Sequence, residues 1–109
     1  MRAASIRNEV DLILTSGGTG FTPDDRTPEA VSALITKQAD SLNQYMQAEA
    51  LKITPMACLS RSVIGVIEQA GKSGPRKSAM VVTLPGKPKA VHENFTILTQ
   101  KRVLQHSIA

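Results

Sequence analysis

A glycine-rich segment is the part of this 109-residue chain best suited to chemistry. It reads Ser-Gly-Gly-Thr-Gly at residues 16–20 and follows directly on an apolar run. Glycines let backbone N–H groups close on phosphate oxygens, and Ser or Thr hydroxyls add further donors. The segment lacks the Lys-Ser/Thr ending of a Walker loop and the third glycine of the dinucleotide fingerprint. It is therefore either a phosphate-binding loop of another kind or an ordinary tight turn.

Three further groups of polar residues allow both a functional and a structural interpretation. Asp25 is either a metal-binding carboxylate or a charge at a helix entry that offsets the helix dipole. Ser60 and Arg61 either contact a ligand or form a surface turn. Lys87 and Lys89 are either phosphate-binding cations or solvated charges.

The other reactive side chains are expected to be structural. His92 and His106 have no Cys or acidic partner at metal-ligand spacing, so both imidazoles are expected to face solvent. Cys58 is the single cysteine, which excludes an internal disulfide framework and a cysteine-based zinc site, and we expect it to be buried. Asp24 is expected to stay in solvent. The methionines expected to fill the core are Met46, Met56 and Met80.

Composition indicates one small globular domain and excludes several functional classes. Charged residues make up 20% of the chain, too few for the highly charged disordered class. Aromatic residues make up 3%, which leaves almost nothing for a base-stacking nucleic-acid surface. Residues 69–109 hold seven Lys/Arg against one Glu, so this part favours an anionic ligand or partner. No apolar run approaches the ~20 residues that span a bilayer, and a cytoplasmic location is expected.

The apolar pattern predicts strands alternating with helices. Residues 10–15 and 79–84 are typical of strands buried on both faces of a parallel sheet. A helix is expected to start at Thr27, because Thr can cap it and Pro suits its first turn. A second helix is expected to end before Pro55, and a third to start near Lys89.

The connecting segments and helix faces complete this pattern. Residues 59–67 predict a loop that feeds a short strand, and residues 69–78 a flexible basic loop. The last helix is expected to face inward with Val91, Phe95 and Leu98. Such alternation indicates an α/β sheet that binds ligands at the carboxyl ends of its strands.

Five sequence blocks occur together in the order and approximate spacing of one protein family. They are residues 11–23, Asp25 with residues 27–30, residues 51–55, residues 59–61 and residues 84–88. On these blocks the chain resembles the molybdopterin adenylyltransferases, which include the MogA-type proteins and the G domain of gephyrin. The resemblance covers about residues 10–98.

The resemblance implies an α/β three-layer sandwich with a mostly parallel sheet, usually assembled as a trimer. It implies an enzyme of molybdenum cofactor biosynthesis that transfers adenylyl from Mg-ATP to the terminal phosphate of molybdopterin and releases pyrophosphate. Mg²⁺, ATP and molybdopterin are thus the implied cofactor and substrates, and a molybdenum-insertase domain is an implied partner. No nucleic acid and no membrane span are expected.

The resemblance also assigns site residues, which are expected to converge on one concave site. Asp25 would organise the metal and so serve as the catalytic residue. Ser60 and Arg61 match a block associated with the pterin. The residues expected to line the phosphate and nucleotide site are Ser16, Gly17, Gly18, Thr19, Gly20, Pro85, Gly86 and Lys87.

The chain departs from the family pattern in four places. Asp24 and Arg26 invert the family's charge order around Asp25, the linker after Gly65 is longer, and the sequence diverges from Thr99 onward. The fourth is a missing first half of the domain, which carries a strand and a second acidic metal ligand. We therefore expect a single, partial domain over residues 1–109, with poorly matched flanks at 1–9 and 99–109.

These departures leave the activity of the chain open. One acidic ligand holds Mg²⁺ poorly, and a truncated sheet leaves an edge strand uncovered, so we expect little adenylylation from the chain alone. The alternatives are an inactive module that still binds molybdopterin or nucleotide, and a gephyrin-like oligomerisation scaffold.

Overall fold

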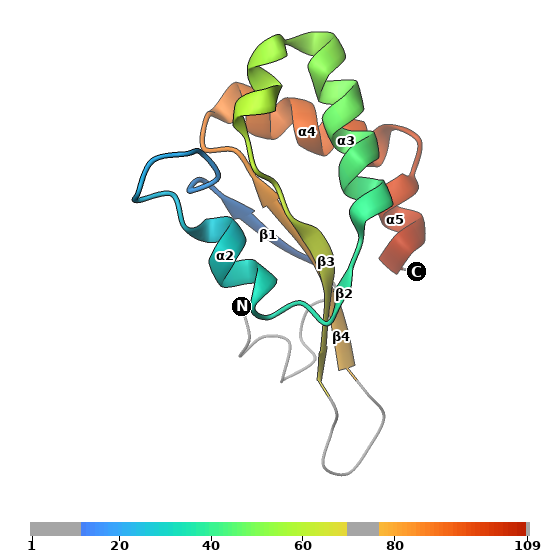
Figure 1. Cartoon of the computed structure of the whole chain (residues 1–109). Helices are drawn as coiled ribbons and strands as arrows, with labels where there is room; N and C mark the ends of the chain where they lie inside the picture. The colour runs from blue at the N-terminus through green and yellow to red at the C-terminus, as the bar shows by residue number, and fades with distance from the viewer. Residues whose placement is uncertain (1–11, 70–76, 109) are drawn as a thin grey trace.

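A four-stranded sheet lies at the centre of the computed structural model, which describes residues 12–69 and 77–108 (Figure 1). The strand order is β1-β4-β3-β2. The strands are β1 (Leu12–Ser16), β2 (Lys37–Gln38), β3 (Ile64–Gln69) and β4 (Lys77–Leu84). The expected α/β class is confirmed.

The two strands on which the functional argument depends run parallel, as expected. Leu12 of β1 lies opposite Met80 of β4, and Ser16 lies opposite Leu84, so both strands end at the same edge of the sheet. The sheet of described strands is nevertheless mixed and not mostly parallel, because β3 pairs antiparallel with both β4 and β2. Only residues 70–76 separate β3 from β4, too few for the crossover of about a dozen residues that a parallel pair needs.

Strand β4 is the buried strand of the sheet, and β1 is not. Residues 79–84 are all buried, as their apolar run predicts. In β1 no residue is fully buried and Leu14 is 43% exposed, because β1 stands at one end of the described strand order. The expectation that β1 is covered on both faces is therefore wrong for the described residues.

Helices cover the two faces of the sheet and make three layers. The helical elements are α2 (Thr27–Ser32), α3 (Asp40–Ile53), the 3₁₀ helix η1 (Pro55–Leu59), α4 (Pro88–Gln100) and α5 (Val103–Ile108). Met46 of α3 and Leu98 of α4 pack with Val82 on one face, whereas Val31 of α2 packs with Val81 on the other. Because successive side chains of a strand point to opposite faces, β4 supplies both cores.

The helix starts and ends follow the expected prolines, but the expectation that Thr27 caps α2 is wrong, because the N-cap is Arg26 and no side chain bonds to the helix start. Proline occupies the first turn of α2, η1 and α4, where its missing N–H costs nothing. Helix α3 ends at Ile53, directly before the Thr54-Pro55 pair. None of the described helices is long and apolar enough to cross a membrane.

Three expected core residues are on the surface. Cys58 is exposed and Met56 is 64% exposed, because η1 is a short turn with no buried residue. Phe95 is 37% exposed, because the inward face of α4 is centred on Asn94, Ile97 and Leu98. The other two methionines, Met46 and Met80, are buried as expected.

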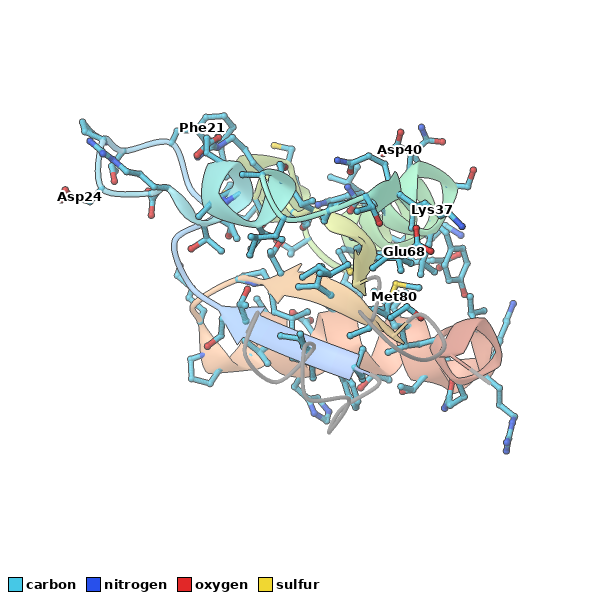
Figure 2. The ribbon with its side chains drawn as sticks, turned by 90° about the horizontal axis from the view of Figure 1, so that it is seen from below. Phe21, Asp24, Lys37, Asp40, Glu68 and Met80 are labelled. Carbon is cyan, nitrogen blue, oxygen red and sulfur yellow. The ribbon has the colours of Figure 1, made fainter. Side chains whose placement is uncertain are left out.

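Asp24 and His92 are exposed to solvent, as the sequence predicts. Figure 2 shows Asp24 and Phe21 on the loop before α2, both exposed, and Lys37 beside Glu68 at the β2–β3 edge. Lys37 and Glu68 form an ion pair of 3.7 Å. His92 is exposed as expected, whereas the side chain of His106, the flank 1–9 and residues 70–76 of the basic loop lie outside the described residues.

The β2–β3 pairing depends on the absence of a side chain at Gly65. A Cβ atom there would lie 2.6 Å from Ile35 Cγ2 and 2.7 Å from the Lys37 carbonyl oxygen. We expect Gly65→Ala to lower the free energy of unfolding by about 1–3 kcal/mol, measured by urea denaturation, because a backbone atom must move. Gly86→Ala is the matched control, because its Cβ would meet nothing closer than 3.4 Å. Equal effects of the two substitutions would contradict this packing.

Candidate functional site

The glycine segment turns sharply at the end of β1 and is hydrogen-bonded to the end of β4 and to the start of α2. Gly17 and Gly18 have φ angles of 91° and 72°, a region that glycine adopts without strain. The Gly17 N–H donates to the Leu84 carbonyl at the end of β4, with an N···O distance of 2.9 Å. The Thr27 N–H at the start of α2 donates to the Gly18 carbonyl at 3.1 Å. A Cβ at Gly18 would fall 2.1 Å from Thr27 Oγ1, so only glycine fits there.

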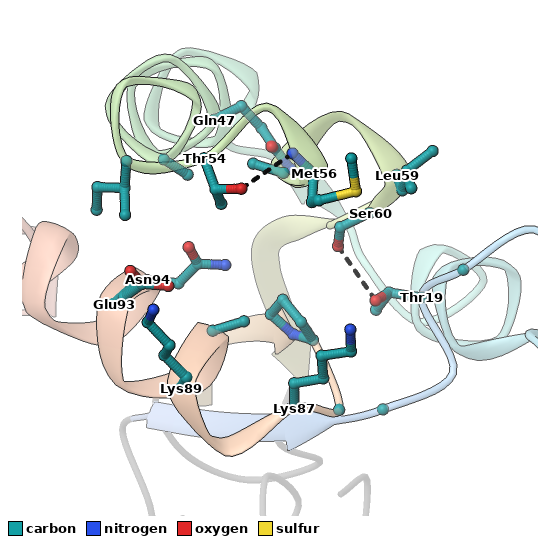
Figure 3. A pocket seen from close by; sticks show the side chains of 18 of the residues that line it. Thr19, Gln47, Thr54, Met56, Leu59, Ser60, Lys87, Lys89, Glu93 and Asn94 are labelled. Carbon is teal, nitrogen blue, oxygen red and sulfur yellow. Dashed lines mark hydrogen bonds between the residues drawn. The ribbon is translucent and has the colours of Figure 1, made fainter.

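A cavity of about 650 Å³ opens beyond the carboxyl ends of β1 and β4 (Figure 3). Residues 17–20 and 85–87 form one side of it, and α3, η1 and the start of α4 form the rest. Its lining is mainly apolar, with Ala50, Ile53 and Met56 among the wall residues. This is where an α/β sheet is expected to bind a ligand.

Most of the expected site residues meet at this cavity. The expected residues that line it are Gly17, Gly18, Thr19, Gly20, Asp25, Ser60, Pro85, Gly86 and Lys87. Ser16 and Arg61 do not line it. The expected convergence is therefore found for nine residues, and their roles toward a ligand stay predictions.

The carboxylate of Asp25 is held by its own loop. Asp25 Oδ2 accepts hydrogen bonds from Thr22 Oγ1 at 2.7 Å and from the Thr22 N–H at 3.0 Å. These two bonds hold the pKa of the Asp25 carboxyl below its ordinary value of 3.8, so it is ionised at neutral pH. Within the described part of the chain, no group of three or more His, Cys, Asp or Glu residues could hold a metal. Asp25 thus places a carboxylate at this end of the cavity, and its role as a metal ligand stays a prediction.

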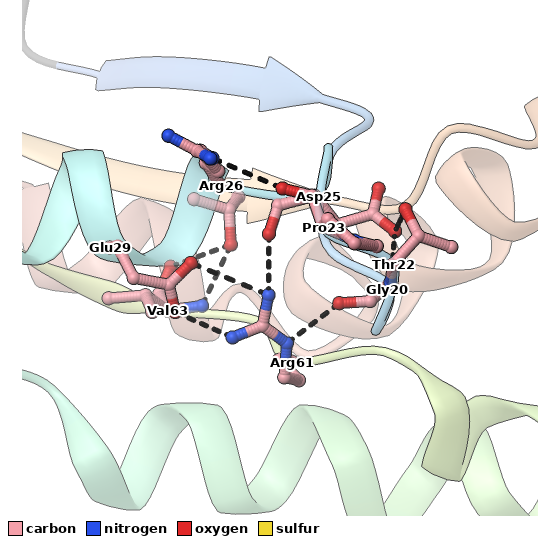
Figure 4. Close-up of polar contacts among 9 residues, drawn as sticks. Gly20, Thr22, Pro23, Asp25, Arg26, Glu29, Arg61 and Val63 are labelled. Carbon is pink, nitrogen blue, oxygen red and sulfur yellow. Dashed lines mark hydrogen bonds and ion pairs between the residues drawn. The ribbon is translucent and has the colours of Figure 1, made fainter.

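Arg61 binds the loop that carries Asp25 instead of facing the cavity (Figure 4). Its Nε donates to the Gly20 carbonyl at 2.7 Å, and its Nη2 donates to the Asp25 carbonyl at 2.8 Å. Its Nη1 forms an ion pair of 2.5 Å with Glu29 of α2, which holds the pKa of that carboxyl below its ordinary value. The guanidinium also lies 5.6 Å from the centre of the Phe21 ring. A ligand contact by Arg61 stays a prediction, but its position after Ser60 ties this segment to the glycine loop.

Ser60 and Thr19 join the same two segments inside the cavity. Ser60 Oγ donates to Thr19 Oγ1 at 3.1 Å, and the Arg61 N–H donates to the Thr19 carbonyl at 2.8 Å. Thr19 is only 4% exposed. Its hydroxyl is thereby fixed at the glycine end of the cavity.

Sequence reasoning missed the polar residues on the helices that line the cavity. Gln47 of α3 and Asn94 of α4 both line it, and Asn94 is 6% exposed. A signal for Asn94 is present in the sequence, because it lies three residues after Val91 and four before Leu98, on the apolar face of the expected helix. A polar residue on such a face is uncommon unless it has a partner.

The sequence model of one family, described as "Probable molybdopterin binding domain", matches residues 1–105. The chain belongs to this family. The match includes the flank 1–9 and part of the flank 99–109. The resemblance carried by the five sequence blocks is confirmed.

Relatives of known name cover most of this chain. The Dictyostelium discoideum protein named gephyrin is 41% identical over 87 residues, which are 80% of this chain and 11% of that protein. The Drosophila melanogaster molybdenum cofactor synthesis protein cinnamon is 39% identical over 102 residues, or 94% of this chain and 15% of that protein. The molybdopterin adenylyltransferase of Escherichia coli K12 is 39% identical over 84 residues, or 77% and 38% of the two chains. The chain thus spans less than half the length of each of these relatives.

Solved structures share the fold. The Mog protein of Mycobacterium ulcerans superposes with a TM-score of 0.76 at 34% identity, over 98% of this chain and 62% of that one. The MoaB enzyme of Thermus thermophilus superposes with a TM-score of 0.77 at 38% identity, over 98% and 60%. The three-layer α/β architecture of this family is therefore confirmed for the chain.

We expect the Arg61 contacts to set the stability of the glycine and Asp25 loops. Arg61→Gln removes charge-assisted bonds to two carbonyls and a carboxylate, so the free energy of unfolding should fall by about 2 kcal/mol in urea denaturation. Arg26→Gln is the matched control, because Arg26 lies in the same loop and makes one exposed bond, to the Pro23 carbonyl. An Arg61→Gln variant as stable as the control would show that Arg61 does not hold this loop.

Proposed function

We propose that the cavity binds molybdopterin together with an adenine nucleotide and belongs to a molybdopterin adenylyltransferase of molybdenum cofactor biosynthesis. The observation that carries this proposal is the junction of the glycine loop and residues 85–87 at one cavity, beyond two parallel strand ends. The names of the Escherichia coli relative and of the cinnamon protein support the same pathway.

The glycine end of the cavity is suited to phosphate. The Gly17 N–H is committed to Leu84, but the N–H groups of Gly18 and Thr19 make no hydrogen bond among the described residues. Lys87 lines the same cavity and supplies a positive charge. Lys89 and Ala90 line it from the first turn of α4, whose dipole adds further positive potential.

The proposed reaction needs positioning and charge neutralisation more than covalent chemistry by the protein. An oxygen of the terminal molybdopterin phosphate attacks the α-phosphorus of ATP. The bond from that phosphorus to the bridging oxygen breaks, and pyrophosphate leaves with its electron pair. Lys87 and the free N–H groups of the glycine loop would stabilise the charge that builds on the phosphate oxygens.

Asp25 is the carboxylate through which the residues present would hold a magnesium ion, weakly unless substrate phosphates complete the site. Mg²⁺ is commonly held by one or two carboxylates, with substrate phosphates and water completing its shell. Asp25 is ionised and lines the cavity on the glycine-loop side. When bound there, the ion would neutralise phosphate charge and orient the triphosphate.

The assembly and partners are proposed on the family resemblance. We propose a homotrimer in the cytoplasm that acts with a molybdenum-insertase domain. The likeness to a protein named gephyrin supports this choice of partner.

We expect Asp25→Asn to separate turnover from binding. In a version of the protein that also supplies the half-domain expected upstream from the family resemblance, the substitution should lower pyrophosphate release from Mg-ATP and molybdopterin at least tenfold. The Kd for molybdopterin should change less than threefold, because a metal-organising carboxylate acts mainly on transition-state charge. Asp24→Asn is the matched control, since Asp24 is exposed and does not line the cavity. Binding of both ligands without pyrophosphate release by the unmodified chain would instead support the inactive binding module. Failure to bind either ligand would refute the proposed function.

A further inference from the structure

Asn94 is a buried polar side chain that the fold itself does not use. It lies on α4 among the buried residues Ile97 and Leu98 and is only 6% exposed. Its amide makes no hydrogen bond with any described residue. Its nitrogen and oxygen are not among the buried side-chain atoms that lack a partner, so both remain accessible from the cavity that Asn94 lines. An amide that the fold leaves unbonded at a cavity wall is available to a ligand.

The amide of Asn94 faces the cavity. Figure 3 shows it directed into the space between α4 and α3, at the end opposite Thr19 and Ser60. By contrast, the other side-chain amide that lines the cavity is already bonded, because Gln47 Nε2 donates to Ser62 Oγ at 2.8 Å. Asn94 thus offers a donor and an acceptor side by side, and both are available to a ligand.

The surroundings of Asn94 are suited to a flat ring. The walls of the cavity include the apolar residues Ala50, Ile53, Met56 and Ala90. Glu93 and Lys89 also line it and lie beside Asn94 in Figure 3. Among the described residues, those that line the cavity include no aromatic side chain, so a ring there cannot be held by stacking on one. The apolar walls can hold a ring of any heterocycle, so hydrogen bonds to the ring edge decide which heterocycle is preferred.

We propose that Asn94 determines ligand specificity by pairing with the edge of a nitrogen heterocycle that carries a donor and an acceptor side by side. Adenine presents such an edge to an amide through N6 and N7, and the 2-amino-4-oxopyrimidine ring of a pterin presents one through N3–H and O4. This inference rests on the proposed function, because it places the phosphate at Lys87 and the ring at the other end. The cavity of about 650 Å³ is large enough for a ring and its phosphate chain.

The test uses the 109-residue chain, two ring-bearing probes and one probe without a ring. The probes are AMP, 6-hydroxymethylpterin monophosphate and ribose 5-phosphate, titrated by calorimetry. The variant is Asn94→Leu, which keeps the size of the side chain and removes both hydrogen-bonding groups. His92→Ala is the control, because His92 is exposed on the same helix and does not line the cavity.

We expect Asn94→Leu to weaken AMP or the pterin probe at least tenfold and to leave ribose 5-phosphate within twofold. The probe that weakens identifies the ring that Asn94 binds. The Tm of the ligand-free variant should be unchanged, since the amide bonds to no described residue and its removal breaks no hydrogen bond of the fold. A structural role would instead lower the Tm and weaken all three probes together, which would overturn the proposal.

The remaining outcomes separate this inference from the proposed function. Unchanged affinity of Asn94→Leu for both ring-bearing probes, with the unmodified chain binding them, would overturn the role of Asn94 alone. Failure of the unmodified chain to bind either ring-bearing probe would overturn both. A loss of affinity in His92→Ala equal to that in Asn94→Leu would also contradict a specific role for Asn94.

Discussion

The hydrogen bond from the Gly17 N–H to the Leu84 carbonyl organises the site. It continues the parallel pairing of β1 with β4 by one step beyond the strands, at 2.9 Å. The glycine loop and residues 85–87 are therefore brought out of the sheet at the same edge. A Cβ at Gly86 would lie 3.4 Å from Gly17 Cα, so the two loops are already in contact. A side chain at Gly18 would collide with the Thr27 hydroxyl at the start of α2.

Arg61 holds the loop between the glycine segment and α2 in place from outside the cavity. It holds the carbonyls of Gly20 and Asp25 and the carboxylate of Glu29, so the loop from the glycine segment to α2 closes around one guanidinium. The cavity then has two unlike ends. One carries backbone N–H groups, Thr19 and Lys87, and the other carries the amide of Asn94 beside Glu93 and Lys89.

The sequence predicted those parts of the fold that depend on local pattern. The run at 79–84 predicted β4, the Thr-Pro pair at residue 27 predicted α2, and the glycine segment predicted one end of the cavity. The exposure of β1 and of Met56 could not be predicted, because it depends on which elements lie beside them in space. Arg61 was expected to contact a ligand. Its sequence block does not show that its guanidinium instead bonds the carbonyls of Gly20 and Asp25. The sequence shows Asn94 as a polar residue on an apolar helix face. Only the structure shows that this face borders a cavity, where the amide can contact a ligand.

The central claim is that one cavity holds phosphate at the glycine loop and a ring at α4. A crystal structure of the chain with bound AMP, or with 6-hydroxymethylpterin monophosphate, tests it most directly. The account predicts phosphate oxygens within hydrogen-bond distance of the Gly18 and Thr19 N–H groups, near Lys87, and the ring edge paired with the Asn94 amide. A ligand with its ring at the glycine loop, or one bound outside this cavity, would contradict the account.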